Sequence, residues 1–279
     1  MCFFFQTPCT PTEWDDIKGK FFEKWQFPQV IGAVDGKHVR IVKPPGSGSD
    51  YFNYKGFCSI IILAVVDADY KFIWHKVGEK GSKGDASIWN KSSFKNKLES
   101  GSLNCPPSVQ VSQQNSIRVP CLLVGDSAFA LSSTMMKPYP NRAIDRSQRI
   151  FNYRLSRARR VVENAFGIIA ARFAIYHRTI PQGPENATKF VLASIALHNY
   201  LRSQKDNRYC CHIDPDHEDV DHNVVAGQWR QVEGAVLPGL DSNNSQRYDM
   251  NGVNIREGLR NYFTGVGAVP WQNSRVFEF

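Results

Sequence analysis

The segment that decides the fold reads VIGAVDGKHVRIV over residues 30–42, and it is followed by CSIIILAVV over 58–66 and YKFIWHKV over 70–77. β-Branched and aromatic residues dominate these runs, as is typical of strands. Within the first run, an Asp35-Gly36 turn or bulge separates two predicted strands, 30–34 and 38–42. The short connection at 67–69 predicts a hairpin between the second and third runs. The domain is therefore expected to open with three sequential antiparallel strands.

The next segments alternate between helix, loop and strand signals. Residues 87–99 are predicted to form a helix, with Asp85 at the position of its N-cap. The polar stretch 100–119 contains Pro and Ser and is interpreted as a surface loop. The compact apolar run 121–124 predicts a further strand.

Two helices are expected downstream. The first covers about 151–173, where apolar residues recur at three- and four-residue steps. The second starts at Pro184, and its predicted inner side consists of Phe190, Ala193, Leu197 and Leu201. Strands first, then helix, strand and two helices predict an α/β fold in which a mixed sheet carries helices on its faces.

Charge is distributed unevenly along the chain, whose net charge is +8. Residues 206–279 hold six Arg against eleven Asp or Glu, whereas residues 141–160 hold seven Arg against one Asp. So dense a positive field suits a polyanion such as DNA, although a solvated helix face is the ordinary alternative. No stretch approaches 18 uninterrupted apolar residues, which excludes a spanning helix. The seven cysteines show no disulfide or zinc framework, which favours reduced thiols.

Two aspartates follow apolar strands directly, where burial of a carboxylate is costly. Asp35 ends the run 30–34 and Asp126 ends the run 122–125, and each has a glycine beside it. Such a carboxylate must be paired or bound to a metal ion, because its desolvation is otherwise uncompensated. The structural alternative is a turn residue that terminates each strand.

Glu163 is the third acidic candidate, on the same face of the 151–173 helix as Arg159 and Arg160. Alone it would indicate no more than a surface Arg–Glu pair. Two strand-end aspartates and a helix glutamate can, however, converge on a pair of Mg²⁺ ions for phosphodiester cleavage. Asp85 could also approach this site, although its position as a helix cap explains it without metal chemistry. The neighbouring cations would then hold the DNA backbone. The predicted DNA-binding residues are Lys37, Arg142, Arg146, Arg149, Arg154, Arg157, Arg159 and Arg160.

At these positions the chain resembles the PIF/Harbinger transposases, which are DDE superfamily endonucleases. The resemblance is carried by IGAVDGKHV at 31–39, GDSAF at 125–129 and SRARRVVENAFG at 156–167. It implies an RNase H-like catalytic domain with Asp35, Asp126 and Glu163 as metal-binding residues. It also implies DNA as the substrate, Mg²⁺ or Mn²⁺ as the cofactor, and cleavage followed by strand transfer in the nucleus, with the cytoplasm as a second compartment. A separate Myb-like DNA-binding partner and an oligomer are further expectations.

The resemblance also predicts how the chain is divided. Residues 1–28 are interpreted as a short N-terminal remnant without a full DNA-binding domain, and 29–203 as the nuclease domain. Residues 204–279 would form an acidic loop and a helical extension. The His and Cys residues of 210–222 invite a zinc interpretation, but a mobile acidic loop explains them as well.

Two other functions remain open at this point. One is a domesticated, transposase-derived factor that binds DNA or protein without cleaving. The other is an RNase H-like nuclease that acts on RNA–DNA hybrids or 3′ ends.

Overall fold

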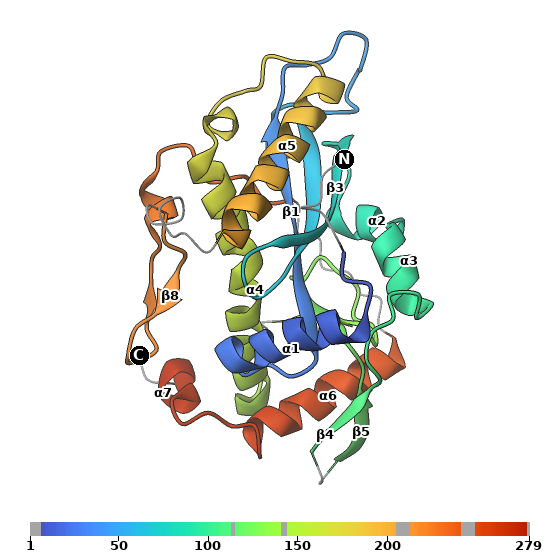
Figure 1. Ribbon diagram of the computed structural model, residues 1–279, viewed down its shortest axis with the longest axis vertical. Coiled ribbons are helices and arrows are strands. Elements are labelled where there is room, and N and C mark those ends of the chain that lie inside the picture. Colours follow the sequence, from blue (N-terminus) through green and yellow to red (C-terminus); the bar gives the residue numbers. More distant parts are fainter. Residues whose placement is uncertain (1–6, 113–114, 141–143, 205–212, 241–248, 278–279) are drawn as a thin grey trace.

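The computed structural model describes residues 7–112, 115–140, 144–204, 213–240 and 249–277. A five-stranded sheet of order β3-β2-β1-β6-β7 forms its centre (Figure 1). Its strands are β1 (Val30–Arg40), β2 (Ser59–Val66), β3 (Phe72–Lys80), β6 (Leu122–Val124) and β7 (Met135–Met136). β1 pairs antiparallel with β2 and β2 with β3, whereas β6 runs parallel to β1 and to β7. The predicted α/β fold, a mixed sheet consistent with an RNase H-like DDE fold, is confirmed.

β1 is one continuous strand, so the predicted turn at Asp35-Gly36 is wrong. Its pairing with β2 runs without a break from Ala33↔Val66 to Arg40↔Ser59. Every residue of β2 is buried, because β2 lies inside the sheet and helices cover it. The continuous hydrogen-bonded ladder therefore outweighs the local Asp-Gly turn signal.

The segment between β3 and β6 differs from its prediction in two ways. The helix expected over 87–99 is two helices, α2 (Asp85–Asn90) and α3 (Ser93–Glu99). The break falls at Ser92, whose side chain accepts a hydrogen bond from the Lys95 amide and so caps α3. The expected loop contains a two-stranded hairpin of β4 (Val109–Ser112) and β5 (Asn115–Val119).

The helix α5 (Pro184–Ser203) is present, but its predicted inner side is wrong. Phe190 is 47% and Leu197 50% exposed. The buried side instead combines the apolar residues Val191 and Ile195 with polar residues that contact the β2–β3 hairpin. His198 Nε2 lies 2.7 Å from the Tyr70 carbonyl, and the Asn199 side chain bonds both backbone polar groups of Phe72. These hydrogen bonds orient the helix against the sheet, and its outer apolar stripe is left exposed.

The remaining elements surround the long helix α4 (Arg146–Arg172), which packs against β1 and β2. The helix α1 (Pro11–Trp25) also contacts β1, and α6 (Met250–Thr264) packs across one end of α4 (Figure 1). The ring of Phe263 in α6 packs edge-to-face on that of Phe27, with the ring centroids 4.9 Å apart, so α6 contributes to the core beside the sheet. The other short elements are η1 (Ala174–Tyr176), β8 (His217–Glu218), β9 (Val224–Val225), η3 (Gln228–Gln231) and α7 (Gln272–Phe277).

The cysteines at positions 9, 58, 105 and 121 are free thiols. Within the ranges that the structure covers, no helix combines the length and the apolar character needed to cross a bilayer.

Candidate metal centre

The register of two parallel strands brings Asp35 and Asp126 together. Ala33 of β1 lies opposite Val124 of β6, and each aspartate follows two residues later. Since the strands are parallel, both carboxylates reach the same edge of the sheet. Residues 91 positions apart in the sequence thus become neighbours, as the sequence predicted.

Asp35 is 6% exposed, and its two carboxylate oxygens have different partners. Oδ1 accepts a hydrogen bond of 2.8 Å from the Gly36 amide, and Oδ2 pairs with the Lys37 ammonium at 2.8 Å. Asp126 is partly exposed, and its Oδ1 accepts a hydrogen bond from the Ala128 amide at 2.9 Å. Both carboxylates are held by local backbone donors, which fixes their direction.

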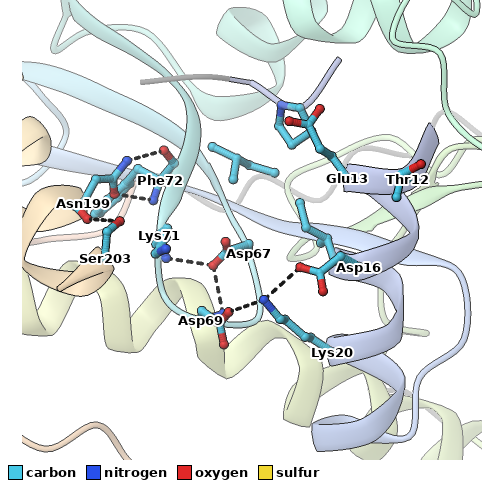
Figure 2. A pocket seen from close by; sticks show the side chains of 13 residues that line it. Thr12, Glu13, Asp16, Lys20, Asp67, Asp69, Lys71, Phe72, Asn199 and Ser203 are labelled. Atoms are coloured by element: carbon cyan, nitrogen blue, oxygen red, sulfur yellow. Dashed lines mark hydrogen bonds and ion pairs between the residues drawn. The ribbon is translucent and has the colours of Figure 1, made fainter. Parts of the chain in front are cut away.

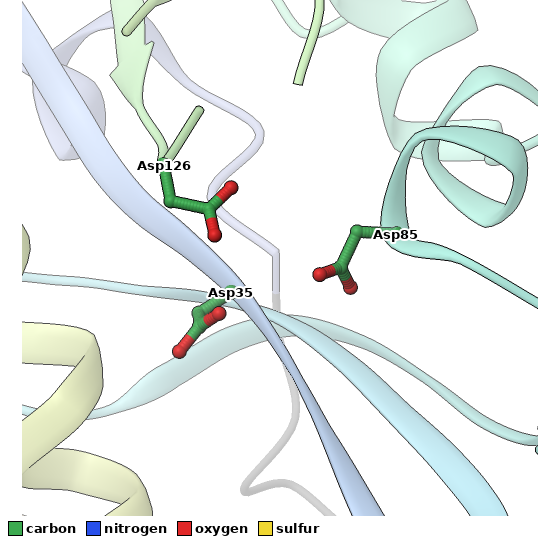
Figure 3. A group of neighbouring side chains, drawn as sticks. All are labelled: Asp35, Asp85 and Asp126. Carbon is green, nitrogen blue, oxygen red and sulfur yellow. The ribbon is translucent and has the colours of Figure 1, made fainter. Parts of the chain in front are cut away.

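A third carboxylate, from Asp85, lies at the same place (Figure 3). One oxygen from each of Asp35, Asp85 and Asp126 lies within 4.8 Å of the others. The sequence assigned Asp85 to a helix cap, and this is wrong. Gly84 occupies the N-cap position, and no side chain caps α2. An approach to the metal site was the alternative, which the sequence could not favour because a carboxylate just before a helix matches the common cap pattern equally well.

Burial and mutual repulsion shape the charge of this carboxylate group. Burial raises the pKa of Asp85 to about 8, and the Asp35 and Asp126 charges add to the effect. Burial likewise raises the pKa of Asp126, with a contribution from Asp35. Burial alone would lower the pKa of Lys37, but the Asp35, Glu163 and Asp85 charges outweigh it and raise that pKa. The site therefore favours an added positive charge.

The donor set fits a hard divalent cation. Three carboxylates offer oxygen ligands, which Mg²⁺ and Mn²⁺ prefer over nitrogen or sulfur. Asp85 Oδ1 is buried and has no hydrogen-bond partner, although an orphaned buried carboxylate oxygen is unfavourable. A cation between the three side chains would satisfy this oxygen.

Glu163 lies beside this group but not within it. Among the described residues, the cluster of mutually close ligands comprises Asp35, Asp85 and Asp126. Glu163 projects from α4, its side chain is 39% exposed, and it pairs with Arg159 at 3.3 Å. It shares a small pocket of about 170 Å³ with Lys37, Trp229 and Arg230. The structure thus joins two of the three predicted metal ligands and leaves the third at the rim.

Three arginines of the predicted DNA-binding run face the protein interior, which corrects their assignment. Arg154 is fully buried, and its guanidinium donates to the Gly267 carbonyl at 3.0 Å and to the Gln26 carbonyl. Arg157 and Arg160 are 2% and 8% exposed and pair with Glu218. These guanidinium groups stabilise the fold and leave no surface for a DNA phosphate.

Contacts of the acidic segment correct its interpretation as a mobile loop. Its described part is docked on α4 and is not a free loop. Asp216 is 1% exposed and pairs with Arg230, and its amide bonds the Asn164 side chain at 2.9 Å. His222 stacks on Trp271 at 3.5 Å. The residues central to the zinc interpretation, 210–212, lie outside the described residues.

The other predicted DNA-binding residues are accessible to different degrees. Arg146 and Arg149, at the start of α4, are exposed. Arg149 and Arg146 are roughly 21 and 26 Å along the helix from Glu163, given a rise of about 1.5 Å per residue. Arg159 is partly exposed, and Lys37 is engaged with Asp35. Arg142 lies outside the described residues.

A family model described as "DDE superfamily endonuclease" matches residues 34–199, more than half of the chain. The chain belongs to this family. The match spans the three clustered aspartates and Glu163, and it confirms the resemblance carried by the sequence motifs. The chain is also 26% identical over 199 residues to "Protein ALP1-like" of Arabidopsis thaliana, an alignment that covers 70% of this chain and 48% of the relative.

Two further relatives have the same sequence identity. "Putative nuclease HARBI1" of Mus musculus and that of Rattus norvegicus are each 26% identical over 199 residues, which cover 70% of this chain and 52% of theirs. The chain thus spans about half the length of the curated relatives it matches. No solved structure matches it significantly.

A second pocket lies away from the carboxylate group, between α1, the β2–β3 turn and α5 (Figure 2). Asp69 pairs there with Lys20 at 2.9 Å and with Lys24. Asp67 accepts backbone hydrogen bonds from Asp69 and Lys71. These charges neutralise one another, so the pocket offers no comparable set of unpartnered ligands.

Proposed function

We propose that this chain is a metal-dependent DNA endonuclease of the transposase type, with Asp35, Asp126 and Glu163 as its metal-binding residues. The observation that carries the proposal is the convergence of Asp35 and Asp126 at one edge of the parallel strands, inside a DDE endonuclease domain. The relatives named as nucleases support the same reaction class.

The roles of the side chains follow from their positions. Asp35 and Asp126 would hold Mg²⁺ or Mn²⁺, which supplies an activated water and neutralises the charge of the scissile phosphate in a two-metal arrangement. Glu163 would join them once its ion pair with Arg159 opens. Arg159 and Lys37, which are already next to the carboxylates, would then be available to contact phosphate oxygens.

DNA contacts away from the reacting phosphate are assigned to Arg146 and Arg149. These two exposed cations lie on α4 at distances from Glu163 that correspond to roughly six to eight base pairs of B-DNA, at about 3.4 Å per base pair. The proposal also includes strand transfer after cleavage, action in the nucleus, and cooperation with a Myb-like DNA-binding protein, all of which rest on the family resemblance. An oligomer and the division of the chain at residues 28 and 203 belong to the same proposal.

A transposase-derived binding factor without cleavage is the second candidate. One observation favours it, because the chain's own cations neutralise two of the expected metal ligands: Lys37 pairs with Asp35, and Arg159 with Glu163.

Cleavage of supercoiled plasmid separates the two candidates. Purified protein is incubated with Mg²⁺ or Mn²⁺ beside an EDTA control, the Asp126→Asn variant and the Asp67→Asn variant, which removes a buried carboxylate outside the site. The nuclease proposal predicts nicking by wild type and Asp67→Asn, and none by Asp126→Asn or in EDTA. DNA binding without nicking in all samples would favour the binding factor.

A further inference from the structure

The side chain of Asp85 has no structural role that accounts for its burial. It is 2% exposed, Oδ1 lacks any hydrogen-bond partner, and it does not cap the helix that it begins. Buried carboxylates are normally paired or bound to a cation, since desolvation penalises the charged form strongly. This one points instead at two further carboxylates, those of Asp35 and Asp126 (Figure 3).

The backbone beside Asp85 leaves just enough space for its carboxylate. A Cβ atom at Gly36 would lie 1.8 Å from Asp85 Oδ1. Any side chain at position 36 would therefore push Asp85 away from Asp35 and Asp126. Position 36 lies in β1, where φ is not positive, so the glycine is needed here for space and not for backbone conformation.

We propose that Asp85 is a metal ligand, and that Asp35, Asp85 and Asp126 together bind one divalent cation of the Mg²⁺ or Mn²⁺ class without Glu163. Hard oxygen ligands suit this class of ion, and a few carboxylates plus water complete its coordination. Glu163 is excluded from this first site because it lies outside the cluster and is paired with Arg159. The inference rests on the proposed function only in that the same ion would serve cleavage.

The competing explanation is that Asp85 stays protonated, fills the space at this site and donates a hydrogen bond to a neighbouring carboxylate, without binding a metal. The two explanations differ in how they respond to Asp85→Asn. An amide has the shape of the protonated acid and can donate the same hydrogen bond, but it is a much weaker ligand for Mg²⁺ or Mn²⁺. A metal-binding measurement therefore distinguishes them without any need for DNA.

The experiment measures Mn²⁺ affinity of EDTA-stripped, dialysed protein, by calorimetry and by loss of the free Mn²⁺ paramagnetic resonance signal. Asp85→Asn is expected to weaken binding at least tenfold. Gly36→Ala keeps every carboxylate but displaces that of Asp85, so it should weaken binding comparably. Without DNA, Glu163 stays paired with Arg159 and outside this first site, so Glu163→Gln should bind Mn²⁺ within twofold of wild type. The matched control Asp67→Asn should do the same. Circular dichroism of each variant in EDTA verifies its fold, and Asp85→Asn, being isosteric, carries the test if Gly36→Ala does not fold.

Two outcomes would overturn the inference. Wild-type Mn²⁺ affinity in folded Asp85→Asn would show that Asp85 fills space and does not bind the metal. A loss of Mn²⁺ affinity in Glu163→Gln equal to that in Asp85→Asn would place Glu163 in the first site. The failure of the proposed function looks different: Mn²⁺ would bind through Asp85 while plasmid stayed intact. Conversely, metal-dependent cleavage with unchanged Mn²⁺ affinity in Asp85→Asn would leave the nuclease proposal standing and refute the role of Asp85.

Discussion

Replacing Asp85 with Asn should make the metal-free protein more stable, and increasingly so as pH rises. The folded-state pKa of Asp85 is about 8, raised first by burial and then by Asp35 and Asp126, against 3.8 for the free side chain. Between these values the folded chain keeps a proton that the unfolded chain releases. The wild-type fold is thus favoured at low pH, and this contribution is lost as pH rises toward 8.

The size of the effect follows from proton linkage. One proton taken up on folding changes stability by about 1.4 kcal/mol per pH unit. From pH 5 to 7.5, wild type should therefore lose about 3 kcal/mol more than Asp85→Asn. With a urea m-value of about 3 kcal/mol/M, the two unfolding midpoints should separate by about 1 M over that range. The measurement is urea unfolding in EDTA, monitored by fluorescence at several pH values.

The matched control is Asp67→Asn, because burial raises the pKa of Asp67 only to about 6. Its stability difference from wild type should stop growing near pH 6, whereas that of Asp85→Asn should grow further. Groups with lowered pKa values, such as Glu218, are common to both proteins and cancel in the difference. A stability difference that does not change with pH, or an Asp85→Asn variant less stable than wild type at pH 7.5, would refute the electrostatic reasoning.

Three further predictions concern residues outside the carboxylate group. Arg157→Met should lower the free energy of unfolding in urea by about 3–5 kcal/mol, because it leaves the Glu218 carboxylate without its main cation. A decrease below about 1 kcal/mol would contradict the Arg157–Glu218 pairing. Gly167→Ala should cost about 1–3 kcal/mol and change tryptophan emission, because its Cβ would lie 2.2 Å from the Trp229 ring; unchanged emission would show that this packing is wrong. The double variant Arg146→Glu, Arg149→Glu should weaken DNA binding and lower the slope of log affinity against log salt by about 2, without loss of thermal stability; an unaltered slope would remove these residues from the DNA surface.

The three leading antiparallel strands, the strand before Asp126 and the Asp35–Asp126 pair could be predicted because they depend on local, short-period signals. Apolar runs identified the strands, and the strand ends placed two aspartates at one edge of the sheet. The long Arg-rich helix was also predicted, but not the direction of its cations. Whether Arg154 faces solvent or core depends on carbonyls of residues 26 and 267, which no local pattern reveals.

The place of Asp85 in the carboxylate group was only an alternative to its predicted cap role, and the buried side of α5 was predicted wrongly, for related reasons. A carboxylate before a helix has the same sequence signature whether it caps the helix or reaches across to β1, and the space made by Gly36 becomes visible only in three dimensions. In α5, the stripe through Phe190 and Leu197 is exposed, whereas the buried side combines Val191 and Ile195 with polar residues. Two of these, His198 and Asn199, bind backbone groups of the β2–β3 hairpin, a contact that no local pattern reveals. In both cases, contacts with segments distant in the sequence decide the arrangement.

Anomalous diffraction from crystals grown with saturating Mn²⁺ tests the metal centre most directly. A manganese peak is expected about 2.0–2.6 Å from carboxylate oxygens of Asp35 and Asp126. Asp85 should contribute a ligand, and Lys37 should have moved away from Asp35. An anomalous map without a peak at these aspartates, with the Lys37–Asp35 ion pair intact, would contradict the central claim that this carboxylate group binds a divalent metal.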